Sequence, residues 1–269
     1  MRTVLFALAL TVWAHAPLQD HSAGPLVIVG GGGTTPGIVS STLTLAGGPE
    51  AIVAVLPQAS AEPDAGDDSV KMWREAGAHE AVKVVLSDRK AAADAIARAT
   101  LIWFPGGDQN RLVKAIDEAG LADLIRARHT AGVVIGGTSA GAAVMSKAMM
   151  TGDANLKSLT TGTTVIAEGL GLWPEAIVDQ HFLTRQRDNR LLSAVLDHPG
   201  LVGVGIDEST AVVVRGSAFT VMGKSAVVVI DARHARVERA APGQPVAARD
   251  VRLSILRAGM SYDLALPHD

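Results

Sequence analysis

Residues 133–143 read VVIGGTSAGAA. The apolar start predicts a buried strand at 133–135, and the small residues that follow predict a helix at 140–150. Between them lies a Gly-x-Ser-x-Gly pattern with Ser139 at its centre. A strand that turns sharply into a helix at such a serine is typical of a nucleophile elbow, which lifts the hydroxyl above the sheet. We therefore expect Ser139 to be a nucleophile; the alternative is a plain packing turn.

On both sides of this stretch, short apolar runs alternate with helical segments. Strands are expected at residues 26–29, 52–56, 82–86, 101–104, 176–178 and 202–206. Helices are expected at residues 36–46, 69–76, 91–99, 110–119 and 121–129. This alternation favours an α/β fold with a parallel sheet that is covered on both faces.

The pattern changes after about residue 200. Three β-type runs, at 210–215, 218–222 and 226–230, are separated by glycine-containing pairs and predict antiparallel hairpins at a sheet edge. A last strand is expected at 249–256. Because no linker-like segment interrupts the chain, we expect one domain over residues 17–269.

The N-terminus has the pattern of a secretory signal peptide. A short basic start precedes the apolar run Val4–Trp13, which is too short to span a bilayer, and Ala14-His15-Ala16 resembles a cleavage site. We expect residues 1–16 to be removed on export, which predicts a periplasmic or extracellular protein. The alternative is a buried N-terminal strand or helix.

Composition excludes several classes of protein. The 269 residues are 48% hydrophobic, which excludes a disordered chain. With 24 basic and 27 acidic residues the net charge is −3, so no basic excess favours nucleic acid or an anionic membrane as a partner. The absence of cysteine excludes disulfides, thiolate metal sites and a cysteine nucleophile.

A serine nucleophile at neutral pH needs a base and a group that orients it. His181 ends the segment Asp179-Gln180-His181-Phe182, directly after an apolar run, where open sheets place their active sites. Asp207 and Glu208 follow the next apolar run, and composition does not choose between them. For His181 alone, a structural role is the alternative. No histidine pair has a zinc-binding spacing, and we expect no metal site.

Two further segments carry binding candidates. Arg185, Arg187 and Arg190 follow His181 and are candidates for binding a carboxylate, with a solvated helix face paired to Asp188 as the alternative. The loop 105–110 follows a strand. Its glycine amides are candidates for an oxyanion hole, and Gln109 for a hydrogen bond to substrate.

Taken together, these segments resemble the cyanophycinase branch of the peptidase E-like (S51) serine peptidases over almost the whole chain after residue 16. The matching residues are Gly30–Gly33, Leu56–Ser60, Phe104–Gln109, Gly136–Ala142, Gly169–Leu172, Asp179–Phe182 with Arg185, Arg187 and Arg190, and Gly205–Glu208.

The resemblance implies a class I glutamine amidotransferase-like (flavodoxin-like) three-layer α/β sandwich. It implies a triad in which Ser139 is the nucleophile, His181 the base and Glu208 the orienting acid, with the Gly107 and Ala140 amides as oxyanion hole. It further implies a substrate pocket and a homodimer, and no cofactor is required. The pocket residues would be Gln109, Asp179, Gln180, Arg185, Arg187 and Arg190.

The implied reaction is hydrolysis of cyanophycin, an arginine-decorated polyaspartate, to β-aspartyl-arginine dipeptides. Relatives cleave aspartyl or isoaspartyl dipeptides, and this remains an alternative because Thr34 and Val70 depart from the pattern of many relatives. A dinucleotide-binding protein is a weaker alternative, since no register of the glycines after Val29 completes Gly-x-Gly-x-x-Gly. A non-catalytic binding protein on the same fold is the other.

Overall fold

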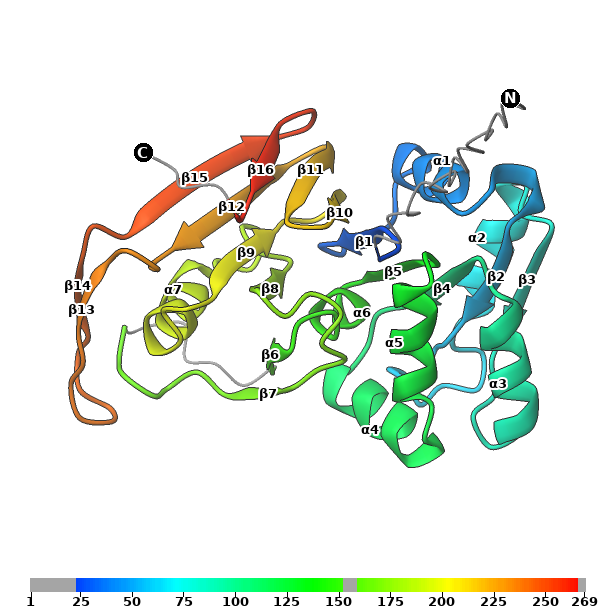
Figure 1. Cartoon of the computed structure of the whole chain (residues 1–269), viewed down its shortest axis with the longest axis horizontal. Coiled ribbons are helices and arrows are strands. Elements are labelled where there is room, and N and C mark those ends of the chain that lie inside the picture. The colour runs from blue at the N-terminus through cyan, green and yellow to red at the C-terminus, as the bar shows by residue number, and fades with distance from the viewer. Residues whose placement is uncertain (1–22, 152–158, 266–269) are drawn as a thin grey trace, which may run out of the picture.

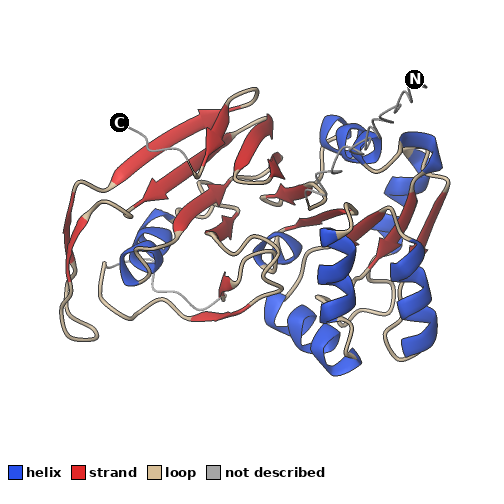
Figure 2. Ribbon diagram, viewed as in Figure 1, coloured by secondary structure: helices blue, strands red, loops and turns tan. Residues whose placement is uncertain are grey.

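The computed structural model describes residues 23–151 and 159–265. Two β-sheets run through this part of the chain, and helices pack against both of them (Figure 1, Figure 2). The larger sheet consists, from edge to edge, of β16 (Ser261–Asp263), β11 (Ala218–Gly223), β10 (Thr210–Arg215), β1 (Leu26–Val29), β5 (Val134–Thr138), β4 (Leu101–Phe104), β2 (Ile52–Val55) and β3 (Glu80–Lys83).

Parallel pairing builds the part of this sheet that lies between β1 and β3. β1 pairs in parallel with β5, β5 with β4, β4 with β2, and β2 with β3. On the other side of β1, the strands β10, β11 and β16 add antiparallel pairs. The α/β class with a mostly parallel sheet and C-terminal antiparallel strands is therefore confirmed.

Helices cover both faces of the larger sheet, as the apolar runs predict. α1 (Pro36–Leu45) and α2 (Asp67–Glu75) pack on one face, and the other face is covered by α3 (Arg89–Arg98), α4 (Gln109–Ala119), α5 (Ala122–Thr130) and α6 (Ala140–Ala143). Along β1 the side chains alternate, since Leu26 and Ile28 contact one cluster and Val27 and Val29 the other. Burial of each such side chain contributes about 1.5–3 kcal/mol.

The second sheet has four strands. Its order is β15 (Arg252–Arg257), β12 (Ala226–Asp231), β9 (Val202–Ile206) and β8 (Ala176–Gln180), with β8 and β9 parallel. α7 (Asp188–Asp197) packs on it so closely that a Cβ at Gly203 would lie 2.6 Å from Val195 Cγ2. Two short ribbons complete the described strands: β6 (Ala148–Met150) with β7 (Ile166–Glu168), and β13 (Arg236–Glu238) with β14 (Ala247–Arg249).

The helix expected at 140–150 is wrong beyond Ala143. The carbonyls of Val144 and Met145 accept hydrogen bonds from Leu170 N–H at 2.7 Å and Trp173 N–H at 2.8 Å. Because these carbonyls bond to a distant segment, they do not continue the helical ladder, and the chain continues into β6 instead.

The C-terminal strands are also divided differently from the prediction. β10 and β11 form the expected hairpin, but β12 leaves that edge and pairs with β9 and β15 in the second sheet. The last long strand begins at Arg252 rather than at residue 249. β3 ends at Lys83, before the expected 86, and Val85 is 57% exposed.

The predicted signal peptide, residues 1–16, lies outside the described residues. In the part that is described, no helix is both long and apolar enough to cross a membrane. The single domain over residues 17–269 stays a prediction.

Candidate active site

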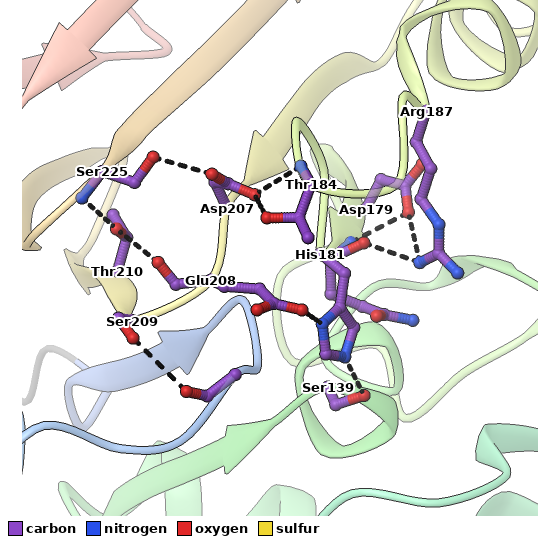
Figure 3. A network of polar contacts seen from close by, with 12 residues as sticks. Ser139, Asp179, His181, Thr184, Arg187, Asp207, Glu208, Ser209, Thr210 and Ser225 are labelled. Atoms are coloured by element: carbon purple, nitrogen blue, oxygen red, sulfur yellow. Dashed lines mark hydrogen bonds and ion pairs between the residues drawn. The ribbon is translucent and has the colours of Figure 1, made fainter.

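Three strand ends bring the predicted serine, histidine and carboxylate together (Figure 3). Ser139 directly follows β5, His181 directly follows β8, and Glu208 lies two residues beyond β9. Ser139 Oγ lies 2.9 Å from His181 Nε2, and His181 Nδ1 lies 2.5 Å from Glu208 Oε1. The three side chains therefore form one chain of hydrogen bonds, although β5 belongs to the larger sheet and the other two strands to the smaller.

Ser139 occupies the strained turn expected of an elbow. Its φ of 54° and ψ of −114° lie outside the usual regions for a residue with a side chain, a conformation that costs about 1–3 kcal/mol. The neighbouring glycines are required by space, because a Cβ at Gly137 would lie 2.5 Å from Gly141 O and one at Gly141 2.0 Å from Phe104 O. Ser139 itself is only partly buried.

The surroundings of His181 favour the neutral imidazole. Burial is the largest effect and lowers its pKa, and the positive charges of Arg185 and Arg187 act in the same direction. The hydrogen bond to Glu208 opposes them but leaves the pKa below its ordinary value. With Nδ1–H donating to Glu208, the unprotonated Nε2 can accept the Ser139 proton, which is the arrangement a general base needs.

Asp207 is the second carboxylate that the residues alone allowed as the orienting acid. In Figure 3 it contacts Thr184 and Ser225, whereas Glu208 contacts His181. Asp207 accepts hydrogen bonds from Thr184 N–H and Oγ–H, both at 2.9 Å, and from Ser225 Oγ–H at 2.7 Å. Burial acts to raise its pKa, but these donors outweigh burial and leave the pKa below its ordinary value. Asp207 therefore links the loop after His181 to the start of β12 and does not contact the imidazole.

The three arginines separate into two buried residues and one exposed residue. Arg190 holds the buried Asp179 with two hydrogen bonds, from Nε at 2.7 Å to Oδ2 and from Nη2 to Oδ1. Arg187 donates through Nη1 to Gln180 O at 2.6 Å and lies 3.5 Å from Asp179 Oδ1. Burial, together with the charge of Arg190, lowers the pKa of Arg187 to about 10. Only Arg185 is exposed.

This arrangement contradicts one of the two sequence hypotheses for Arg187 and Arg190, and the carboxylate-binding role stays a prediction. The solvated helix face paired to Asp188 is wrong for them, because they are buried and their carboxylate partner is Asp179 from β8. The guanidinium of Arg190 already binds a carboxylate of the chain itself, that of Asp179, through two hydrogen bonds. Arg185 keeps its guanidinium at the surface.

Two glutamines lie near this cluster. Gln109 is buried at the start of α4 and donates through Nε2 to Met150 O at 2.9 Å. Gln180 is 5% exposed, and its Oε1 has no hydrogen-bond partner within the described residues. A buried amide oxygen without a donor is costly, so Gln180 Oε1 is a candidate to accept a hydrogen bond from a ligand.

The predicted oxyanion amides lie on the two loops beside Ser139. A Cβ at Gly106 would lie 3.3 Å from Ser139 Cβ, which places the loop of Gly107 directly next to the serine. Ala140 is the first residue of α6. Neither the Gly107 nor the Ala140 N–H donates to a carbonyl of the described residues.

Sequence reasoning missed the role of the glycines after β1. They invite comparison with a dinucleotide-binding loop, but the space beside them is filled: a Cβ at Gly31 would lie 2.2 Å from His181 Cε1, and one at Gly32 2.6 Å from Glu208 Oε2. The Cβ side of these two glycines is therefore occupied by side chains of the proposed triad. The signal that could have found this role was the run of consecutive glycines itself, which permits a close approach of other chain segments.

Comparison with known proteins identifies the family of the chain. The family model of peptidase family S51 matches residues 26–222. A cyanophycinase from Geminocystis herdmanii is 39% identical over 229 residues, which cover 81% of this chain and 84% of the relative. A cyanophycinase from Trichormus variabilis is 35% identical over 230 residues, covering 81% and 77%.

Two solved structures share the fold. A peptidase from an acI-B1 actinobacterium has a TM-score of 0.65 at 22% identity, covering 91% of this chain and 98% of its own. A peptidase E-like protein from Listeria monocytogenes has a TM-score of 0.57 at 15% identity, covering 76% and 100%. With the family model matching over half of its length, the chain belongs to peptidase family S51 and is a serine-type peptidase.

Proposed function

We propose that this peptidase hydrolyses cyanophycin to β-aspartyl-arginine dipeptides through a Ser139–His181–Glu208 triad. The observation that carries the proposal is the hydrogen-bond chain from Ser139 Oγ through His181 to Glu208, at 2.9 and 2.5 Å. A hydroxyl, an imidazole and a carboxylate in this order activate a serine for attack on a carbonyl.

The reaction proceeds in two halves. His181 takes the Ser139 proton as Oγ attacks the scissile carbonyl carbon, and the amides of Gly107 and Ala140 bind the oxyanion that forms. His181 then gives the proton to the leaving amine, the C–N bond breaks, and an acyl-enzyme remains. Water attacks this ester with His181 as base, and Ser139 recovers its proton as the acid product leaves. No cofactor takes part.

Charge near the site supports an aspartate-rich substrate. Within the described residues Arg187 and Arg190 share one carboxylate partner, Asp179, and Arg185 adds a further positive charge at the surface. Arg185 is exposed and close enough to lower the pKa of His181. The α-carboxylates that the arginine units of cyanophycin leave free suit this surface, and the relatives at 35–39% identity are named cyanophycinases. Gln109 and Gln180 complete the proposed pocket.

The substrate assay separates the polymer from shorter peptides. The purified protein is incubated with insoluble cyanophycin and, separately, with isoaspartyl dipeptides, and the products are identified by mass. We expect β-aspartyl-arginine from the polymer and none from the Ser139→Ala variant. Cleavage of dipeptides alone would establish the aspartyl or isoaspartyl dipeptidase alternative. Binding of the polymer without any product would favour a non-catalytic protein.

Replacing Arg185 by Gln is expected to move the pH dependence of the site. Arg185 lowers the pKa of His181, so removing its charge raises that pKa and keeps the base protonated to higher pH. The acid limb for labelling of Ser139 by a small neutral serine reagent should therefore shift to higher pH. Arg185→Lys keeps the charge and serves as the control. Identical acid limbs in wild type and Arg185→Gln would contradict this coupling.

The finer fold, export and assembly belong to the same proposal. The two-sided helix cover of the parallel sheet supports a class I glutamine amidotransferase-like three-layer sandwich. The pattern of residues 1–16 supports removal of a signal peptide and a periplasmic or extracellular location. A homodimer follows from the resemblance. N-terminal sequencing of the mature protein and its mass in solution test the last two points.

A further inference from the structure

Consecutive backbone carbonyls at the end of β1 accept hydrogen bonds from the loops that carry the triad. The bonds are Ser139 N–H to Val29 O at 3.0 Å, His181 N–H to Gly30 O at 2.6 Å, Ser209 N–H to Gly31 O at 2.8 Å and Ser209 Oγ–H to Gly32 O at 3.3 Å. One short segment therefore holds the nucleophile, the base and the residue after the orienting acid.

The three residues that donate these bonds share an unusual backbone. Ser139, His181 and Ser209 have φ values of 54°, 49° and 55°. They are three of the five non-glycine residues with positive φ in the described part of the chain. Such conformations persist only where the surroundings impose them. The common feature here is a hydrogen bond to the end of β1.

The same segment also touches the side chains of the base and the acid. At Gly31 a Cβ would lie 2.2 Å from Cε1 and 2.4 Å from Nε2 of His181. At Gly32 it would lie 2.5 Å from Cβ and 2.6 Å from Oε2 of Glu208. The bare backbone of these two glycines therefore forms the wall against which the imidazole and the carboxylate rest. Gly33 differs, because nothing lies within 4 Å of its Cβ position.

We propose that Gly30–Gly32 is a positioning loop, which sets the imidazole of His181 in line with Ser139 Oγ and Glu208. The loop acts through its contacts with the residues of the triad. This inference deepens the proposed function and rests on it. A displacement of a catalytic group by about 1 Å costs about 100-fold in rate, and a methyl group at Gly31 demands a movement of the ring.

The test compares Gly31→Ala with Gly33→Ala. Both glycines have positive φ, 102° and 92°, so both variants carry similar backbone strain, but only Gly31 faces His181. We expect kcat of Gly31→Ala on β-aspartyl peptide to fall about 100-fold with KM little changed. Gly33→Ala should keep a kcat close to that of wild type. Rates are expressed per folded molecule, with the folded fraction measured by near-UV circular dichroism.

Gly32→Ala supplies a second readout that a loss of stability would not move. The hydrogen bond from His181 to Glu208 raises the pKa of His181. If the new methyl group displaces Glu208, the hydrogen bond between His181 and Glu208 weakens, and the pKa of His181 falls further. The acid limb for labelling of Ser139 by a small neutral reagent should then shift to lower pH than in wild type and in Gly33→Ala.

The outcomes separate this inference from the proposed function. If folded wild-type protein neither cleaves the peptides nor is labelled at Ser139, the proposed function fails. If wild type is active, the kcat of Gly31→Ala equals that of Gly33→Ala, and the acid limb of Ser139 labelling in Gly32→Ala stays at the wild-type pH, the positioning role is overturned. The proposed function then still stands. Failure of both Gly31→Ala and Gly32→Ala to fold would also overturn it, since the loop would then serve the fold and not the alignment of the triad.

Discussion

Ser139→Ala is expected to lower kcat on β-aspartyl peptide at least about 10⁴-fold, the usual cost of losing a triad nucleophile. The physical reason is that Ser139 Oγ is the atom placed 2.9 Å from His181 Nε2, so its removal leaves the base with no hydroxyl to activate. The measurement is steady-state release of product, with far- and near-UV circular dichroism to compare the folds. The alanine should not disturb the elbow, because the turn depends on Gly137 and Gly141.

Ser40→Ala is the matched control. Ser40 is an exposed serine of α1, on an element that carries no residue of the proposed triad, so its loss should leave kcat unchanged. Activity that persists in folded Ser139→Ala would remove Ser139 from the mechanism. The hydrogen-bond chain would then have a structural role only.

Asp179→Asn is expected to have the largest effect on stability, a loss of about 3–5 kcal/mol in the free energy of unfolding. The Asp179 side chain is fully buried, and Arg190 holds both of its oxygens. Asparagine keeps the size but removes the charge, which leaves Arg190 and the neighbouring Arg187 buried without the counter-charge of Asp179. Urea denaturation of the purified variant measures the change.

Asp67→Asn tests whether burial is the reason. Asp67 pairs with Lys83 at 2.5 Å, but its side chain is 60% exposed. Exposed pairs contribute about 0–1 kcal/mol, so this variant should unfold close to wild type. If Asp179→Asn proved as mild as Asp67→Asn, the buried arginine cluster would not be needed for the fold, and a pocket role for all its members would be favoured.

Local patterns in the sequence were enough to place most strands and helices of the larger sheet. β1 and β4 have the predicted bounds, because each is a four-residue apolar run, too short for a helix, that ends at a glycine or a proline. The elbow was also readable, since Gly-x-Ser-x-Gly between a strand and a helix is a local constraint on one turn. For His181 and Glu208 the residues alone were not sufficient, and the resemblance selected them.

What the sequence determined by itself is therefore what depends on near neighbours: the strand and helix periods and the turn at Ser139. The tertiary structure alone decided the end of the helix at Ala143 and the pairing of Arg190 with Asp179, and it placed Glu208 rather than Asp207 at the imidazole. It also placed Gly31 and Gly32 against His181 and Glu208. These outcomes depend on contacts such as that from Ser209 to Gly32, which are 177 residues apart. No periodicity or turn motif encodes such a contact, because it forms only when two sheets bring their strand ends together.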